Sequence, residues 1–181
     1  MEFNEVIIKR RSIRKFAPDP VPEALLTRIF EAARLSPTWG NRQGVRYIVV
    51  TDPPIVQKIK AATLQGWTKS APMFIVVCID PKDSGKNPAG LDYFTVDAAI
   101  CLTQLILAAT NEGLGTVWMG WFDEGKIRDA LKIPESIRIV GLTPLGYPDP
   151  KHALKAQERK SLSDLVFRDI FNEPYYNSSN K

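Results

Sequence analysis

The sequence contains little histidine and cysteine, two residue types from which many catalytic and metal centres are built. Its 181 residues include one histidine, His152, too few for a multi-histidine metal site, and its two cysteines, Cys78 and Cys101, form no CxxC pair. It lacks the GxSxG nucleophile motif of many hydrolases. It also lacks the GxGxxG motif and the P-loop lysine that commonly bind nucleotides. An enzyme with this sequence would therefore take its reactivity from a bound group, and we expect no metal site.

Neither sign of charge is in strong excess. Lys and Arg number 24 and Asp and Glu 20, which gives a formal net charge of +4. That charge is too small and too dispersed for a nucleic-acid-binding face. The N-terminus carries acidic residues where a signal peptide would be positive, and the apolar run 98–109 is too short to cross a bilayer. Together with cysteines typical of free thiols, this predicts a cytoplasmic protein without nucleic-acid or membrane partners.

The chain shows no repeat, low-complexity tract or linker, so we expect one domain over residues 1–181. Apolar spacing predicts helices over residues 3–7, 22–36, 52–59, 91–111, 123–131 and 163–171. Apolar and β-branched runs predict strands over residues 47–50, 73–79, 116–119 and 137–142. Gly113 is expected to end the long helix as a left-handed C-cap, and residues 173–181 to be extended. Four strands among five or six helices indicate an α+β domain.

The most pointed local feature is the stretch RRSIRKF at residues 10–16, which gathers four cations around Ser12. Arginine guanidinium groups bind phosphate oxygens bidentately, and a serine hydroxyl adds a short neutral donor. The stretch therefore suits a phosphate-bearing ligand. A solvated charged loop is the alternative.

Three further stretches carry possible ligand contacts. In SPTWGNRQG, residues 36–44, amides and hydroxyls of Thr38, Asn41 and Gln43 could bind a planar heterocycle, or the stretch could be an ordinary turn. In GTVWMG, residues 115–120, glycines allow close approach to a ring, or the stretch could be core packing. Near the C-terminus, cations at 159–160 could reach the same phosphate or merely be exposed.

Taken in order, these segments resemble the nitroreductase family of FMN-dependent oxidoreductases. The matching stretches are RRSIRKF at 10–16, EAARLSPTWGNRQ at 31–43, APMFIVV at 71–77, GLGTVWMG at 113–120, GYPDP at 146–150 and RKSLSDLV at 159–166. The resemblance implies a nitroreductase-like α+β fold in an intertwined homodimer. Its central mixed sheet of four or five strands would be flanked by helices. The long helix 91–111 would form much of the dimer core, and the tail 163–181 would pack on the partner.

The resemblance also implies which residues bind FMN at the interface between the subunits. The phosphate would be held by Arg10, Arg11 and Ser12, together with Arg159 and Lys160 from the C-terminal part of the chain. Arg14 would reach the pyrimidine edge of the flavin and act as the catalytic residue by stabilising negative charge there. The isoalloxazine would be approached by Pro37, Thr38, Trp39, Asn41 and Gln43 of one subunit and by Trp118, Met119 and Gly120 of the other.

The implied activity is hydride transfer from NADH or NADPH, followed by reduction of a nitroaromatic, quinone or related conjugated acceptor in a ping-pong mechanism. Reductive dehalogenation or flavin cleavage within the same family is one alternative, and a non-catalytic FMN-binding protein is another. The sequence departs from the family in two ways that matter. The chain is short, so the insertion that covers the pocket in larger relatives is expected to be reduced or absent. Many relatives read NxQPW where this chain has NRQGV at residues 41–45, so the wall built there differs in shape.

Overall fold

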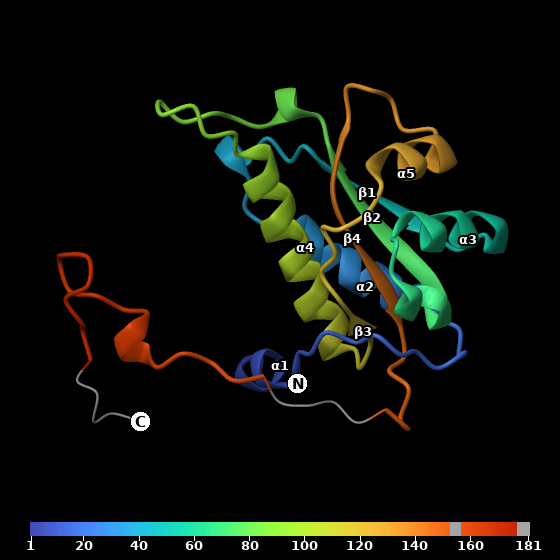
Figure 1. The fold of residues 1–181 in the computed structure, drawn as a ribbon, viewed down its shortest axis with the longest axis horizontal. Coiled ribbons are helices and arrows are strands. Elements are labelled where there is room, and N and C mark those ends of the chain that lie inside the picture. Colours follow the sequence, from blue (N-terminus) through green and yellow to red (C-terminus); the bar gives the residue numbers. More distant parts are fainter. Residues whose placement is uncertain (153–156, 177–181) are drawn as a thin grey trace.

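Four antiparallel strands form the centre of the protein in a computed structural model that describes residues 1–152 and 157–176 (Figure 1). The strands are β1 (Val45–Val50), β2 (Met73–Ile79), β3 (Gly115–Thr116) and β4 (Arg138–Gly146), in the spatial order β1-β2-β4-β3. Every ladder between them is antiparallel. The mixed sheet expected from the resemblance is therefore reduced to one isolated parallel bridge, between Ser12 and Thr116.

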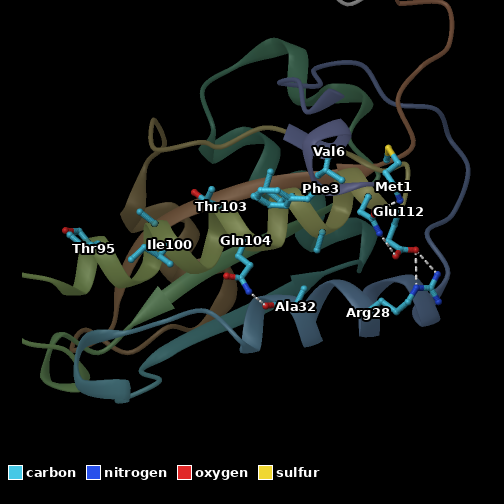
Figure 2. A pocket seen from close by; sticks show the side chains of 15 residues that line it. Met1, Phe3, Val6, Arg28, Ala32, Thr95, Ile100, Thr103, Gln104 and Glu112 are labelled. Atoms are coloured by element: carbon cyan, nitrogen blue, oxygen red, sulfur yellow. Dashed lines mark hydrogen bonds and ion pairs between the residues drawn. The ribbon is translucent and has the colours of Figure 1, made fainter. Parts of the chain in front are cut away.

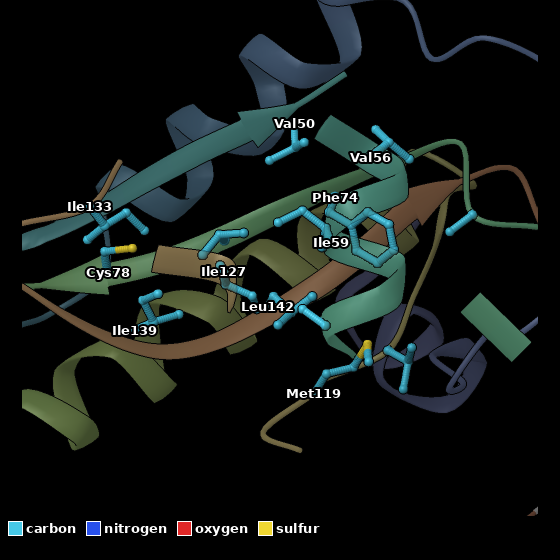
Figure 3. Close-up of a cluster of buried hydrophobic side chains, with 14 of the residues drawn as sticks. Val50, Val56, Ile59, Phe74, Cys78, Met119, Ile127, Ile133, Ile139 and Leu142 are labelled. Carbon is cyan, nitrogen blue, oxygen red and sulfur yellow. The ribbon is translucent and has the colours of Figure 1, made fainter. Parts of the chain in front are cut away.

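Among the described residues, five α-helices pack around this sheet (Figure 1). They are α1 (Phe3–Lys9), α2 (Glu23–Arg34), α3 (Pro53–Ala62), α4 (Phe94–Asn111) and α5 (Glu124–Leu131). Successive side chains of a strand point to opposite faces, so the fully buried β2 serves two cores. Met73, Ile75 and Val77 join a cluster with α2 and α4. Phe74, Val76 and Cys78 join a cluster with α3 and α5 (Figure 3).

The central helix α4 is apolar enough, by length and composition, to cross a membrane. In this fold it packs instead against α2, α1 and the sheet. Seven of its side chains are buried: Asp97, Ala98, Cys101, Leu102, Leu105, Ile106 and Ala109. It ends as predicted, because Gly113 adopts a left-handed φ of +77° and the N–H of Leu114 donates to the carbonyl of Ala109 at 2.8 Å.

The predicted α+β class is confirmed, with three local differences. The long helix begins at Phe94 rather than residue 91, because the Asn87 side chain accepts the N–H of Leu91 at 2.9 Å and holds residues 87–91 in a turn. The strand predicted over 116–119 is only Gly115–Thr116. After it, the N–H of Val117 donates to the Thr143 hydroxyl rather than to a strand backbone.

The third difference concerns the tail predicted to be helical over residues 163–171. It contains only a 3-10 turn, Leu162–Asp164, and then folds back so that Phe167 bridges Pro174. The reversal uses left-handed residues, Asp169 at φ +60° and Asn172 at φ +70°, which a helix cannot include. Of the expected extended end, residues 177–181 lie outside the described residues.

Candidate functional site

The basic stretch 10–16 lies along the sheet edge next to β3. The N–H of Ile13 donates to the carbonyl of Thr116 at 2.8 Å, and Phe16 bridges Pro148 beyond the end of β4. The contact is close, since a Cβ on Gly115 would come within 2.8 Å of the Ile13 side chain. The apolar side chains of Ile13 and Phe16 are buried. Ser12, which alternates with Ile13 along the extended chain, is left exposed.

The cations of this stretch have no carboxylate partners. Among the described residues, no Asp or Glu oxygen lies within 4.0 Å of a side-chain nitrogen of Arg10, Arg11, Arg14 or Lys15. Arg11 is partly engaged, because its Nη1 donates to the carbonyls of Ile8 and Arg10 at the end of α1. Uncompensated guanidinium groups beside an exposed hydroxyl form a donor set that suits an anion.

The fold adds a neighbour to this stretch that the sequence analysis missed. A 3-10 segment, Gly66–Ser70, packs beside it, and the Ser70 hydroxyl accepts the N–H of Phe16 at 3.3 Å. The guanidinium carbon of Arg14 lies 5.7 Å from the centroid of the Trp67 ring. This cation–π contact limits where the Arg14 charge can lie. No local pattern around Trp67 marks it, because its contact with Arg14 arises only from the fold.

The second predicted group, in residues 37–43, is held at the start of α4. The Asp97 carboxylate accepts the N–H of Trp39 at 2.9 Å, and the Trp39 indole packs on Tyr93 with ring centroids 4.6 Å apart. The indole thus contacts its own chain. Four predicted residues of the segment keep exposed or half-exposed surface: Pro37, Thr38, Asn41 and Gln43.

In the third predicted group, residues 118–120, the middle residue is buried and the other two are exposed. The Met119 side chain is 3% exposed and belongs to the core (Figure 3), and its N–H and carbonyl both pair with Leu142 at 3.0 Å. Trp118, 39% exposed, and Gly120 offer the accessible surface of this group. Core packing, the alternative interpretation of residues 115–120, therefore holds for the Met119 side chain.

The fourth predicted group, Arg159 and Lys160, is exposed in the described part of the tail. The Nη1 of Arg159 donates to the carbonyl of Glu158 at 3.1 Å. Within the described ranges, neither residue forms a hydrogen bond or ion pair with the stretch 10–16.

The two main groups also lie at opposite ends of α4. Residues 37–43 are attached at Asp97, whereas the stretch 10–16 pairs with Thr116, just beyond the last turn of the helix. From Asp97 to Asn111 the helix rises about 20 Å, at about 1.5 Å per residue. The two groups of one chain are therefore attached about 20 Å apart along the helix axis.

Between these ends, α4 carries an open apolar groove of about 1080 Å³ (Figure 2). It runs from Thr95 to Glu112 and is also lined by Met1 and Phe3 at the N-terminus. The polar groups at its rim bond to one another within the same chain. The Met1 ammonium donates to Asn111, and Arg28 forms a 2.8 Å ion pair with Glu112.

Neither cysteine is suited to nucleophilic chemistry. Burial raises the pKa of the Cys78 thiol to about 11 and also raises the pKa of Cys101. Both thiols therefore remain protonated near neutral pH and are poor nucleophiles. Across residues 1–152 and 157–176 there is also no cluster of three potential metal ligands.

Comparison with known proteins identifies the family. The family model described as "Nitroreductase family" matches residues 7–78 and 57–147 of the chain. The chain belongs to the nitroreductase family. A crystal structure of a nitroreductase family protein from Clostridium novyi NT superposes with a TM-score of 0.80 at 34% identity, covering 97% of each chain.

Two curated relatives of this nitroreductase family chain carry flavin in their names. The NADPH-flavin oxidoreductase of Vibrio harveyi is 30% identical over 197 residues, which cover 96% of this chain and 82% of that protein. The FMN reductase [NAD(P)H] of Bacillus subtilis (strain 168) is 30% identical over 173 residues, which cover 84% and 70%.

The residues present fit FMN on chemical grounds. FMN needs charged donors and a hydroxyl for its phosphate, which Arg10 and Ser12 offer, and a further cation for its pyrimidine edge, which Arg14 offers. Neither arginine has a carboxylate partner among the described residues. The heterocycle needs neutral donors and acceptors, and the exposed side chains of Asn41 and Gln43 supply both.

Proposed function

We propose that this protein is an FMN-dependent oxidoreductase that takes hydride from NADH or NADPH and reduces nitroaromatic, quinone or related conjugated acceptors. The observation that carries the proposal is the row of cations at residues 10–16, which lacks carboxylate partners in the described part of the chain. Bound FMN would supply the redox chemistry, accepting hydride from the nicotinamide and passing electrons to the acceptor.

We propose further that the working unit is a cytoplasmic homodimer with one cofactor site at each end of the α4 interface. The open groove supports this, since an exposed apolar surface of that size on a helix indicates a protein partner. If two copies of α4 pack antiparallel, the start of one helix meets the end of the other. Residues 37–43 of one subunit would then face the stretch 10–16 of its partner.

The tail supports the same assembly. Within residues 157–176, five large side chains are about half or more exposed: Leu162, Leu165, Ile170, Phe171 and Tyr175. Phe171 reaches 79% exposure, although it contacts Phe167 edge-on. Apolar side chains with this exposure are stabilised by packing on another surface, and we propose that this surface is the partner subunit.

Each cation has a separate proposed task. Arg10 and Ser12 would hold the phosphate, with Arg11 contributing the guanidinium nitrogens that α1 leaves free and Arg159 and Lys160 closing from the tail. Arg14 would place its charge at the pyrimidine edge, where it stabilises negative charge that develops on reduction. Its contact with Trp67 keeps the guanidinium in place before the donor arrives.

The first test is cofactor binding. Arg10→Ala and Ser12→Ala should each raise the FMN dissociation constant, because a hydrogen bond to a charged group contributes about 1.5–3 kcal/mol, or roughly 10- to 100-fold. Titration of stripped protein with FMN, followed by flavin fluorescence, measures it. Lys58→Ala, which removes an exposed cation from α3, is the matched control. Unchanged binding in both site variants would remove the stretch from the cofactor site.

The second test is turnover. Rapid anaerobic mixing with NADH and NADPH should bleach the flavin absorbance, and an added quinone or nitroaromatic should restore it. Arg14→Ala should slow bleaching while FMN stays bound. A flavin that remains oxidised with both donors would indicate a non-catalytic FMN-binding protein. Turnover with halogenated aromatics but not with quinones would indicate the dehalogenase alternative.

A further inference from the structure

Residues 38–43 adopt an unusual backbone shape with several left-handed residues. Gly40, Asn41 and Gln43 are left-handed, with φ values of +53°, +56° and +54°. Such angles are unfavourable for residues other than glycine. Inside the segment, the N–H of Gln43 donates to the Thr38 hydroxyl at 3.0 Å, and the N–H groups of Asn41 and Arg42 donate to the carbonyls of Thr38 and Trp39 at 2.9 and 3.0 Å. Further support comes from elsewhere in the fold.

Asp97 of α4 supplies much of that support. Its side chain is 2% exposed, and its two oxygens hold two different segments. One oxygen accepts the N–H of Trp39 at 2.9 Å, and the other accepts the Ser84 hydroxyl at 2.6 Å. Within the described residues, no Lys, Arg or His nitrogen lies within 4.0 Å of it. A buried carboxylate without a cation needs such donors, so both oxygens are committed to these bonds.

The two segments that Asp97 joins are also interlocked with each other. A Cβ on Gly85 would lie 2.0 Å from the Trp39 indole, so only glycine fits beneath that ring. Arg42 donates through Nη1 to the carbonyl of Ser84. The arrangement attaches residues 38–43 to α4 as one rigid unit.

We propose that Asp97 is a positioning residue for the cofactor site, which it serves by fixing residues 38–43 through the N–H of Trp39 and the hydroxyl of Ser84. The inference rests on the proposed function, in which exposed atoms of Asn41 and Gln43 face the FMN of the partner subunit. Asp97 itself touches neither cofactor nor substrate. Its effect reaches the site because the left-handed segment relaxes when the carboxylate is removed.

Two substitutions of Asp97 test the proposal on the full-length protein. Asp97→Ala leaves the N–H of Trp39 without its acceptor and should weaken FMN binding roughly tenfold or more. Asp97→Asn keeps the shape, since its oxygen accepts from Trp39 and its amide donates to Ser84, so binding should be rescued to within about threefold. Leu105→Ala is the control for lost stability, because Leu105 is buried on the same helix and lies in the core cluster with β2. It should lower the melting temperature without changing FMN affinity.

Hydrogen exchange of FMN-free protein supplies a readout that is independent of the cofactor. Peptides covering residues 38–43 should exchange faster in Asp97→Ala than in Leu105→Ala or the wild type. Equal FMN affinity and equal exchange in the two alanine variants would overturn the inference and leave the proposed function standing. A wild type that binds no FMN would instead overturn the proposed function, and the inference with it.

Discussion

The two faces of the sheet are covered to different degrees. The face under α3 and α5 is closed, with Ile59, Phe74, Ile127 and Leu142 all fully buried in one cluster (Figure 3). The face under α2 and α4 has an equally buried inner layer, but the outer side of α4 remains an open groove (Figure 2). Stability can therefore come from the closed face within one chain.

The open face carries the apolar groove along α4. The candidate groups are divided between the faces: residues 37–43 are attached to α4 at Asp97, whereas Ile13 and Phe16 of the stretch 10–16 pack in the cluster with α3 and α5. Around α1, Phe3 and Ile8 are both more than half exposed. The difference teaches that packing within one chain completes the fold, whereas the proposed site needs a second chain.

The largest expected effect comes from placing a charge in the groove. Ile100→Arg puts a guanidinium on the groove side of α4, where Ile100 is 36% exposed. A buried, unpaired charge at a protein interface is strongly unfavourable. We therefore expect the dimer to dissociate fully, with loss of FMN because each proposed site draws on both subunits. Size-exclusion chromatography with light scattering measures the mass.

The matched variant for this prediction places arginine on the opposite face. Ala61 lies on the exposed side of α3, so Ala61→Arg should change neither the oligomeric state nor the FMN content. A monomeric wild type, or an Ile100→Arg protein that still forms a dimer, would contradict the assignment of the groove as the interface.

A pair of phenylalanine substitutions sharpens the same comparison. Phe74→Ala empties a fully buried position of the closed face and should lower the free energy of unfolding by about 3–5 kcal/mol. Phe3 is 70% exposed beside the groove, so Phe3→Ala should weaken subunit association rather than folding of the chain. Urea unfolding at several protein concentrations separates the two effects, because only association depends on concentration. A concentration-dependent loss in Phe74→Ala alone would reverse the roles of the two faces.

Much of the fold follows from local patterns. The continuous apolar run of β2 predicts a strand covered on both faces, and the structure confirms it. Gly113 predicts the end of α4, because helices commonly end at a glycine in the left-handed conformation, which Gly113 adopts. The stretch RRSIRKF is conspicuous because four cations and a serine stand close together in the sequence.

What the sequence did not reveal depends on contacts between distant segments. Asp97 looks like an acidic residue near a helix start, and its bonds to Trp39 and Ser84 appear only when three segments meet. The contact of Trp67 with Arg14 has the same origin. The tail was predicted to be helical from its apolar spacing, yet it reverses direction at Asp169. Apolar spacing indicates which side chains need to be buried. It does not indicate which distant segments bury them.

The smallest expected effect lies at the rim of the closed face, where Glu124 of α5 joins β4. Burial by itself would raise the pKa of Glu124, but hydrogen bonds from Arg138, from the N–H of Ile139 and from Arg128 together lower that pKa below its ordinary value of 4.5. A carboxyl group with a lowered pKa in the folded state stabilises the fold above its unfolded pKa. It loses that stabilisation as the pH falls through the folded value.

Glu124→Gln should therefore cost about 1 kcal/mol of unfolding free energy at neutral pH, since the carboxylate is partly exposed and its ion pairs are screened. The difference from the wild type should shrink as the pH falls from the ordinary carboxyl value of 4.5 through the lower pKa of the folded state. Urea titrations across the acid range measure it, with Glu135→Gln as an exposed control that has no ion-pair partner among residues 1–152 and 157–176. Because α5 belongs to the closed face, the mass of the assembly should stay the same in both variants. A change in mass with Glu124→Gln would mean that the closed face also takes part in association, and the contrast between the faces would fail.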